Sequence, residues 1–77
     1  MRYENCSDFV EITHGMSIDH TRESFEVWCV DTNLGFIPEE LAVPVRKTDH
    51  EGFENLKKVV SAWAETRGYV PVPSKPI

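Results

Sequence analysis

The chain lacks the sequence patterns by which membrane proteins and exported proteins are usually recognised. In its 77 residues no apolar run approaches the roughly 18 residues that a membrane-spanning helix needs. The first residues, from Met1 to Cys6, contain no apolar stretch of the kind that a signal peptide carries. We therefore expect a cytoplasmic protein without a membrane partner. Cysteine is also scarce, and in the cytosol Cys6 and Cys29 would both be free thiols.

Motifs for common catalytic and cofactor sites are absent as well. The sequence contains no phosphate-binding glycine loop, no nucleophile elbow and no dinucleotide-binding fingerprint. Zinc sites usually take two of their ligands from one tight turn, and no two potential ligands in this sequence are close enough for that. The potential ligands are Cys6, His14, His20, Cys29 and His50. We therefore predict a protein that is not an enzyme and that has no metal and no cofactor. A small enzyme or metal-binding protein built on these side chains is the alternative.

The composition is that of one small globular domain. Hydrophobic residues make up 40% of the chain and charged residues 27%, which is ordinary for a folded protein and argues against disorder. A chain of this length can bury only a thin core. We predict a single α+β domain over residues 1–70, followed by a proline-containing C-terminal tail over residues 71–77. Within the tail, Pro73 and Pro76 have a P-x-x-P spacing, which is a weak pattern for peptide recognition.

One long amphipathic helix, from Thr48 to Gly68, is the clearest structural signal. Thr48 and Glu51 have the spacing of a capping box, and Gly68 is expected to end the helix in the left-handed conformation. Between these ends, apolar residues recur at spacings of three and four, which places on one stripe Phe53, Leu56, Val59, Val60 and Trp63. A helix with a single apolar stripe must cover another element.

Shorter segments predict a sheet for this helix to cover. From the alternation of apolar residues, the expected strands are residues 8–14, residues 24–30, residues 41–45 and a possible short strand over residues 69–72. Gly15 is expected to end the first strand, and Pro44, which has no N–H to donate, places the third at an edge. Residues 1–7 are interpreted as a lead-in. The prediction is a two-layer α+β domain with a three- to four-stranded, mainly antiparallel sheet and the long C-terminal helix packed on one face.

Two registers of the second strand give different environments for Trp28. If Phe25, Val27 and Cys29 face the helix, Trp28 and Val30 lie on the open face of the sheet, where an exposed tryptophan often anchors a partner. In the opposite register Trp28 points inward, and the C-terminal tail could also cover it. The helix is expected to pack on sheet residues Val10, Ile12, Val27, Leu41 and Val43.

Charge is unevenly distributed along the chain. The net charge is −5, and residues 1–40 hold nine acidic and two basic residues, whereas residues 41–77 hold four acidic and six basic residues. An acidic surface keeps a small protein soluble, and it can also steer a basic partner. A general nucleic-acid binder usually shows the reverse sign, because phosphate contacts supply most of its affinity.

These observations together predict a non-enzymatic, acidic protein-binding module, such as an inhibitor or adaptor that acts on a basic protein partner. The profile is similar in type to small accessory or inhibitory proteins, including those that phages use against their hosts. The predicted partner-binding residues surround an aromatic centre; they are Trp28, Glu11, Glu23, Glu26 and Asp31. A homodimer that buries the same tryptophan is the closest competing prediction.

Nucleic-acid binding is the alternative function that the basic residues suggest. The only basic cluster in the sequence consists of Arg46, Lys47, Lys57 and Lys58. Trp28 or Tyr69 could then serve as a platform on which bases stack. Glu54 precedes Lys57 by three residues, so an intrahelical ion pair accounts for part of this cluster without any ligand. The negative net charge also weighs against nucleic acid as a partner.

Overall fold

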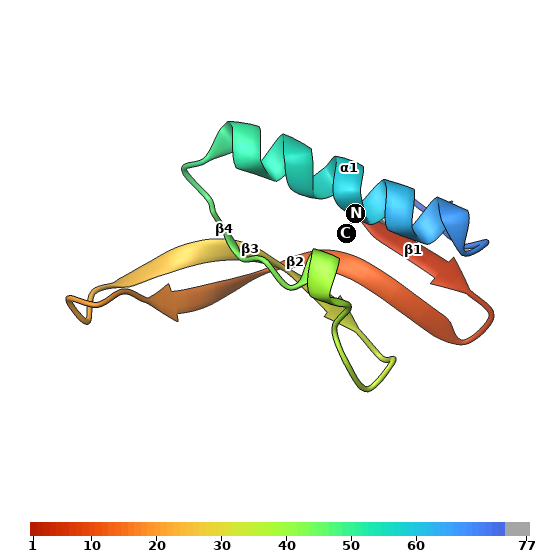
Figure 1. Ribbon diagram of the computed structural model, residues 1–77, viewed down its shortest axis with the longest axis horizontal. Coiled ribbons are helices and arrows are strands. Elements are labelled where there is room, and N and C mark those ends of the chain that lie inside the picture. Colours follow the sequence, from red (N-terminus) through yellow and green to blue (C-terminus); the bar gives the residue numbers. More distant parts are fainter. Residues whose placement is uncertain (74–77) are drawn as a thin grey trace.

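The computed structural model describes residues 1–73, which form one α+β domain in two layers (Figure 1). One layer is an antiparallel sheet with the strand order β4-β3-β2-β1-β5, and the other is a single long helix that crosses one face of the sheet. In chain order the elements are β1 (Arg2–Asn5), β2 (Asp8–Ile18), β3 (Ser24–Thr32), the 3-10 turn η1 (Glu39–Leu41), β4 (Val45–Arg46), α1 (His50–Thr66) and β5 (Val70–Val72). The predicted α+β class is confirmed, with five strands in residues 1–73 in place of three to four.

The first two strands differ from the prediction. The segment interpreted as a lead-in contains β1, which lies between β2 and β5 and pairs with both of them. This strand is too short and too polar to show an alternating pattern, and its pairing partners on both sides define it. Gly15 was expected to end the next strand, but β2 continues to Ile18 because β3 supplies a pairing partner up to Ser24.

The helix was predicted well, apart from its first residue. Asp49, and not Thr48, is the N-cap, and its side chain accepts a hydrogen bond from the backbone N–H of Gly52 at 2.9 Å. At the other end Gly68 has the expected left-handed conformation, with φ of 80°. The N–H of Tyr69 donates to the carbonyl of Ala64 at 2.9 Å, which completes a Schellman motif.

The predicted third strand is mostly a different structure. Leu41 belongs to the 3-10 turn η1 and is buried in the core, whereas Val43 is 58% exposed. Only Val45 and Arg46 form a strand, and this strand lies at the edge of the sheet, as Pro44 indicated. The alternation of apolar residues over this segment therefore reflects one buried side chain on a turn and a short strand, and not a single continuous strand.

At the opposite edge, β5 extends the sheet past the boundary expected between domain and tail. Tyr3 pairs with Pro71 and Arg2 with Val72, so the sheet includes the first two residues of the expected tail. Pro71 is tolerated there because β5 is an edge strand. Residues 74–77, and with them most of the P-x-x-P pattern, lie outside the described residues.

The core lies between the helix and the β1–β2–β3 part of the sheet. The helix contributes Leu56, Val60, Trp63 and Ala64, and these pack against Tyr3, Val10, Ile12, Val30, Leu41 and Tyr69. The Tyr3 hydroxyl donates a hydrogen bond to Ser61 Oγ at 2.9 Å and ties β1 to the helix. Val27 is also buried, but it lies outside this cluster. The register of β3 is therefore the one that turns Val30 and Trp28 toward the helix, and the packing expected for Val27 and Val43 is wrong.

The β2–β3 hairpin is longer than the helix can cover. Figure 1 shows both strands continuing beyond the N-terminal end of α1 and ending in a turn that stands away from the rest of the domain. We call this part of the hairpin, residues 13–29, the arm. The molecule is correspondingly elongated, with principal extents of 41 × 28 × 22 Å.

Candidate functional site

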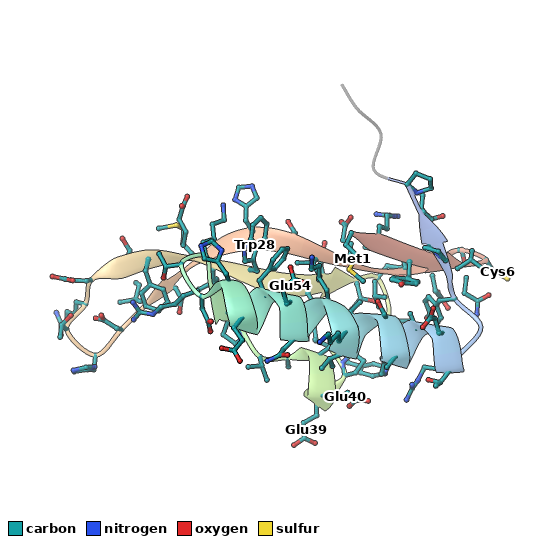
Figure 2. The ribbon with its side chains drawn as sticks, turned by 90° about the horizontal axis from the view of Figure 1, so that it is seen from above. Met1, Cys6, Trp28, Glu39, Glu40 and Glu54 are labelled. Carbon is teal, nitrogen blue, oxygen red and sulfur yellow. The ribbon has the colours of Figure 1, made fainter. Side chains whose placement is uncertain are left out.

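Trp28 lies at the base of the arm, where the hairpin leaves the cover of the helix (Figure 2). Its ring stacks on Phe53 of α1, with ring centroids 4.9 Å apart and an interplanar angle of 27°. Lys47 Nζ lies 4.7 Å from the centroid of the same ring, and His14 on β2 approaches it edge-on with centroids 6.4 Å apart. The tryptophan is therefore half-buried: one face packs on the helix while the ring borders the open part of the arm.

Beyond Trp28, the side of the arm that faces the helix layer carries exposed apolar residues. Side chains on a strand alternate, so His14, Met16 and Ile18 share this side of β2 with Trp28 and Glu26 of β3. Met16 is 63% exposed and Ile18 is 68% exposed, since no helix residue lies above them. We call this set the arm surface: His14, Met16, Ile18, Glu26 and Trp28.

An ordered turn closes the arm and carries acidic side chains. Asp19 accepts hydrogen bonds from the Thr21 hydroxyl and from the backbone N–H groups of Thr21 and Glu23. The hydrogen bond from the Thr21 side chain is the main cause that lowers the pKa of Asp19 below its ordinary value. Over the whole arm there are three acidic residues and one arginine, which gives it a negative charge.

The remaining predicted site residues lie on the other side of the sheet. Glu11 and Asp31 are directly opposite each other in the β2–β3 ladder and face away from the helix. Glu11 accepts a hydrogen bond from Arg2 Nη1 at 3.2 Å, and Arg2 also pairs with Glu4 at 2.8 Å. The structure thus brings Glu26 and Trp28 together, places Glu23 in the turn, and separates Glu11 and Asp31 from them. The signal was available in the sequence, because residues 26 and 28 share the parity of an alternating strand and residue 31 does not.

The basic cluster is likewise divided between two sides. Arg46 stacks on Phe25, 3.9 Å from the ring centroid, on the side away from the helix. Lys47 lies over Trp28 on the helix side, and Lys57 lies 4.9 Å from the ring centroid of Phe53. Lys57 also pairs with Glu54 at 2.8 Å, which is the intrahelical ion pair that the sequence predicted. The four cations therefore do not form one continuous basic face.

The potential metal ligands do not converge. Cys6 is exposed in the turn between β1 and β2, Cys29 is half-buried on β3, and both are free thiols. Within residues 1–73 no group of three or more histidine, cysteine, aspartate or glutamate side chains is arranged to hold a metal ion.

A groove that the sequence did not indicate lies between the N-terminal half of α1 and the segment that contains β4. It encloses about 500 Å³, and its apolar lining comes from Val43, Pro44, Val45, Leu56 and Val59. Glycine at position 52 brings the helix close to β4 there, since a Cβ on this residue would lie 3.0 Å from Val45 Cγ1. Polar side chains border the groove, namely Glu40, Arg46, Asp49 and Asn55.

Comparison of the chain with known protein families, with curated proteins and with solved structures finds no match. In the part of the chain that the structure describes, no helix has the length and apolar character needed to cross a membrane.

Proposed function

We propose that this protein is a non-enzymatic protein-binding module whose arm surface docks on a protein partner with a basic surface. One observation carries the proposal: the β2–β3 hairpin extends past the helix and leaves Met16 and Ile18 exposed beside a half-buried tryptophan. Exposed apolar side chains that cluster around an aromatic residue are typical of protein-binding surfaces. The protein would act as an inhibitor if the arm covers a functional site of the partner, and as an adaptor if it does not.

The apolar part of the surface supplies affinity. Full burial of an aliphatic side chain is worth roughly 1.5–3 kcal/mol, and Met16 and Ile18 retain most of this gain because they are exposed in the free protein. Trp28 contributes less new area, since one of its faces is already stacked on Phe53. Its role on this surface is that of a rigid centre, held in place by the helix.

The acidic part of the surface supplies orientation and speed of association. Glu26 lies opposite Met16 in the ladder, and Asp19 and Glu23 lie in the turn that ends the arm. Acidic side chains around an apolar centre attract a basic partner and make the association sensitive to salt. Glu11 and Asp31 are left out of the proposed contact, because they face the other side of the sheet.

Charge reversal on the arm tests this proposal. The partner is first captured from the native host with the wild-type protein, identified and purified. It should bind the Glu26→Lys variant at least about tenfold more weakly than the wild type, and this binding should depend less on the salt concentration. Glu39→Lys is the matched control, because it makes the same charge change on the exposed 3-10 turn η1 (Figure 2). If both variants lost the same affinity for the partner, the effect would be one of net charge alone, and the arm surface would not be the binding site.

Nucleic-acid binding is a second candidate, favoured by the lysines that lie over Trp28 and Phe53. Aromatic rings flanked by cations can stack bases and hold the phosphate backbone. The complex should then weaken steeply as salt is added, and Lys47→Ala should reduce it further. A gel shift at low salt that detects no complex with single- or double-stranded DNA or RNA would eliminate this candidate.

A further inference from the structure

Part of β2 is a sheet edge without a partner strand. β1 pairs with β2 only from Asp8 to Glu11, and one further hydrogen bond on this side joins the N–H of Ile12 to the carbonyl of Met1 at 2.9 Å. From residue 13 to residue 18 no strand among residues 1–73 lies on this side of β2. The arm is therefore a two-stranded ribbon there, and its β2 side is open.

The direction of the backbone groups on this edge follows from the ladder. Because the N–H of Ile12 points toward β1, the alternation of a strand turns the N–H and C=O groups of His14, Met16 and Ile18 to the same side. Residues 13, 15 and 17 point the opposite way and pair with β3. The open edge thus presents regularly spaced donors and acceptors along a strand that pairs without a bulge from Val10 to Ile18.

The usual protections of an edge strand are missing from this segment. Proteins block an open edge with lysine, proline, an inward charge or a bulge. The segment from Thr13 to Ile18 contains no lysine, arginine, aspartate, glutamate or proline. Its pairing with β3 continues without a bulge. The open backbone edge is also bordered by Met16 and Ile18, which are exposed on the helix side.

We propose that the occupant of this edge is a second copy of the chain, paired antiparallel along residues 14–18 so that two sheets become one. A twofold axis at Met16 places Met16 against Met16 of the second copy and His14 against Ile18 of the second copy. Every residue whose backbone points outward then meets another such residue, so the edge is complementary to itself, as a twofold contact requires. No like charges oppose each other over these residues, because the acidic side chains of each arm lie in the turn and on β3 and not on the paired segment.

The pairing also places the rest of the molecule favourably. The two arms overlap at the centre while each helix covers the far end of its own sheet, as the position of α1 in Figure 1 indicates. Both copies of Met16 and Ile18 come to lie next to each other on one face of the joined sheet, and that face remains open to the protein partner proposed above. A small domain with a thin core gains buried area in this way. The inference does not rest on the proposed function, because it concerns the purified protein alone.

Sedimentation equilibrium of the purified protein over a range of concentrations tests the dimer. The wild type should show a monomer–dimer equilibrium, and Met16→Lys should raise the dissociation constant by at least about tenfold, because it places two lysines against each other at the axis. The monomer should stay folded, since residue 16 is exposed and faces Glu26 of β3. Ser24→Lys is the matched control: it adds the same charge on the same side of the arm, on the strand away from the open edge, and should leave the equilibrium unchanged.

Residue-resolved amide hydrogen exchange supplies a readout that no other dimer would give. The amides of His14, Met16 and Ile18 should become protected as the concentration rises, whereas those of Thr13, Gly15 and Ser17 should be protected throughout because they bond to β3. A monomer at every concentration, or a dimer that leaves the three outward amides unprotected, would overturn the proposal. Protection that appears only after a different protein is added would also overturn it and would assign the edge to that protein.

Discussion

At the scale of single residues, Gly52 shows how the helix and the sheet edge constrain each other. A Cβ at this position would collide with the carboxylate of Asp49, which caps the helix, and would lie 3.0 Å from Val45 Cγ1. Glycine in the first turn of a helix normally lowers its stability relative to alanine. At this position it allows the cap and the contact with β4 to form together.

The Gly52→Ala substitution should therefore destabilise the protein, against the general helix preference. Propensity alone favours alanine by about 1 kcal/mol, but displacement of the cap and crowding of Val45 should cost more, for a net loss of roughly 1 kcal/mol. Chemical denaturation measures this difference. Asn55→Ala, an exposed helix position on the border of the same groove, is the control and should be neutral or slightly stabilising. A more stable Gly52→Ala variant would contradict the account of the close contact.

The residue scale is also where the sequence was least informative about the candidate site. Strand alternation alone indicates that Glu26 and Trp28 share a side, and it separates Asp31 from them. Which side faces the helix is decided by contacts between residues far apart in the chain, among them the packing of Val30 in the core and the stacking of Trp28 on Phe53. The exposure of Met16 and Ile18 depends on where the helix begins relative to the hairpin, and no local pattern encodes that.

At the scale of elements, the length and periodicity of a segment decided how well it could be predicted. The helix has a repeated apolar stripe and distinct end signals, so its existence and its C-terminal glycine were predicted correctly. β1 and β4 are too short for an alternating pattern, and each is defined by the strands beside it. The buried Leu41 misled the reading of its segment because a 3-10 turn places it in the core.

Substitutions on the apolar stripe of α1 test the packing of this helix on the sheet. Leu56 is 5% exposed and packs in the core between helix and sheet, so Leu56→Ala should cost about 2–5 kcal/mol, enough to unfold much of a domain with a small core. Val59 is 40% exposed on the same stripe, and Val59→Ala should cost less than about 1 kcal/mol. Thermal unfolding followed by circular dichroism compares the two. If Leu56→Ala left the melting temperature unchanged, the packing of α1 on the sheet would have to be abandoned.

At the scale of the whole molecule, the structure divides into a packed body and an arm. The buried residues of the main core come from β2 only up to Ile12 and from β3 only at Val30, and Trp28 at the base of the arm packs against them. Residues 16–26 of the hairpin contribute none. Part of the negative charge of residues 1–40 is located at the end of the arm, because the turn there carries acidic residues. The sequence predicted an acidic binding module, whereas the separation of body from arm appears only in three dimensions.

Removal of the distal arm tests this division and both proposals together. Replacing residues 16–26 by Asn-Gly joins Gly15 to Val27, which face each other in the ladder, through a two-residue turn of the type that hairpins prefer. Because the main core is retained, the shortened protein should unfold cooperatively, with a melting temperature within a few degrees of the wild type. It should be monomeric at every concentration and should fail to retain the partner that the wild type binds.

A shortened chain that does not fold would show that the arm belongs to the folding unit. A folded one that still dimerises or still binds the partner would show that those contacts lie on the body, where the groove beside β4 would be the next surface to examine.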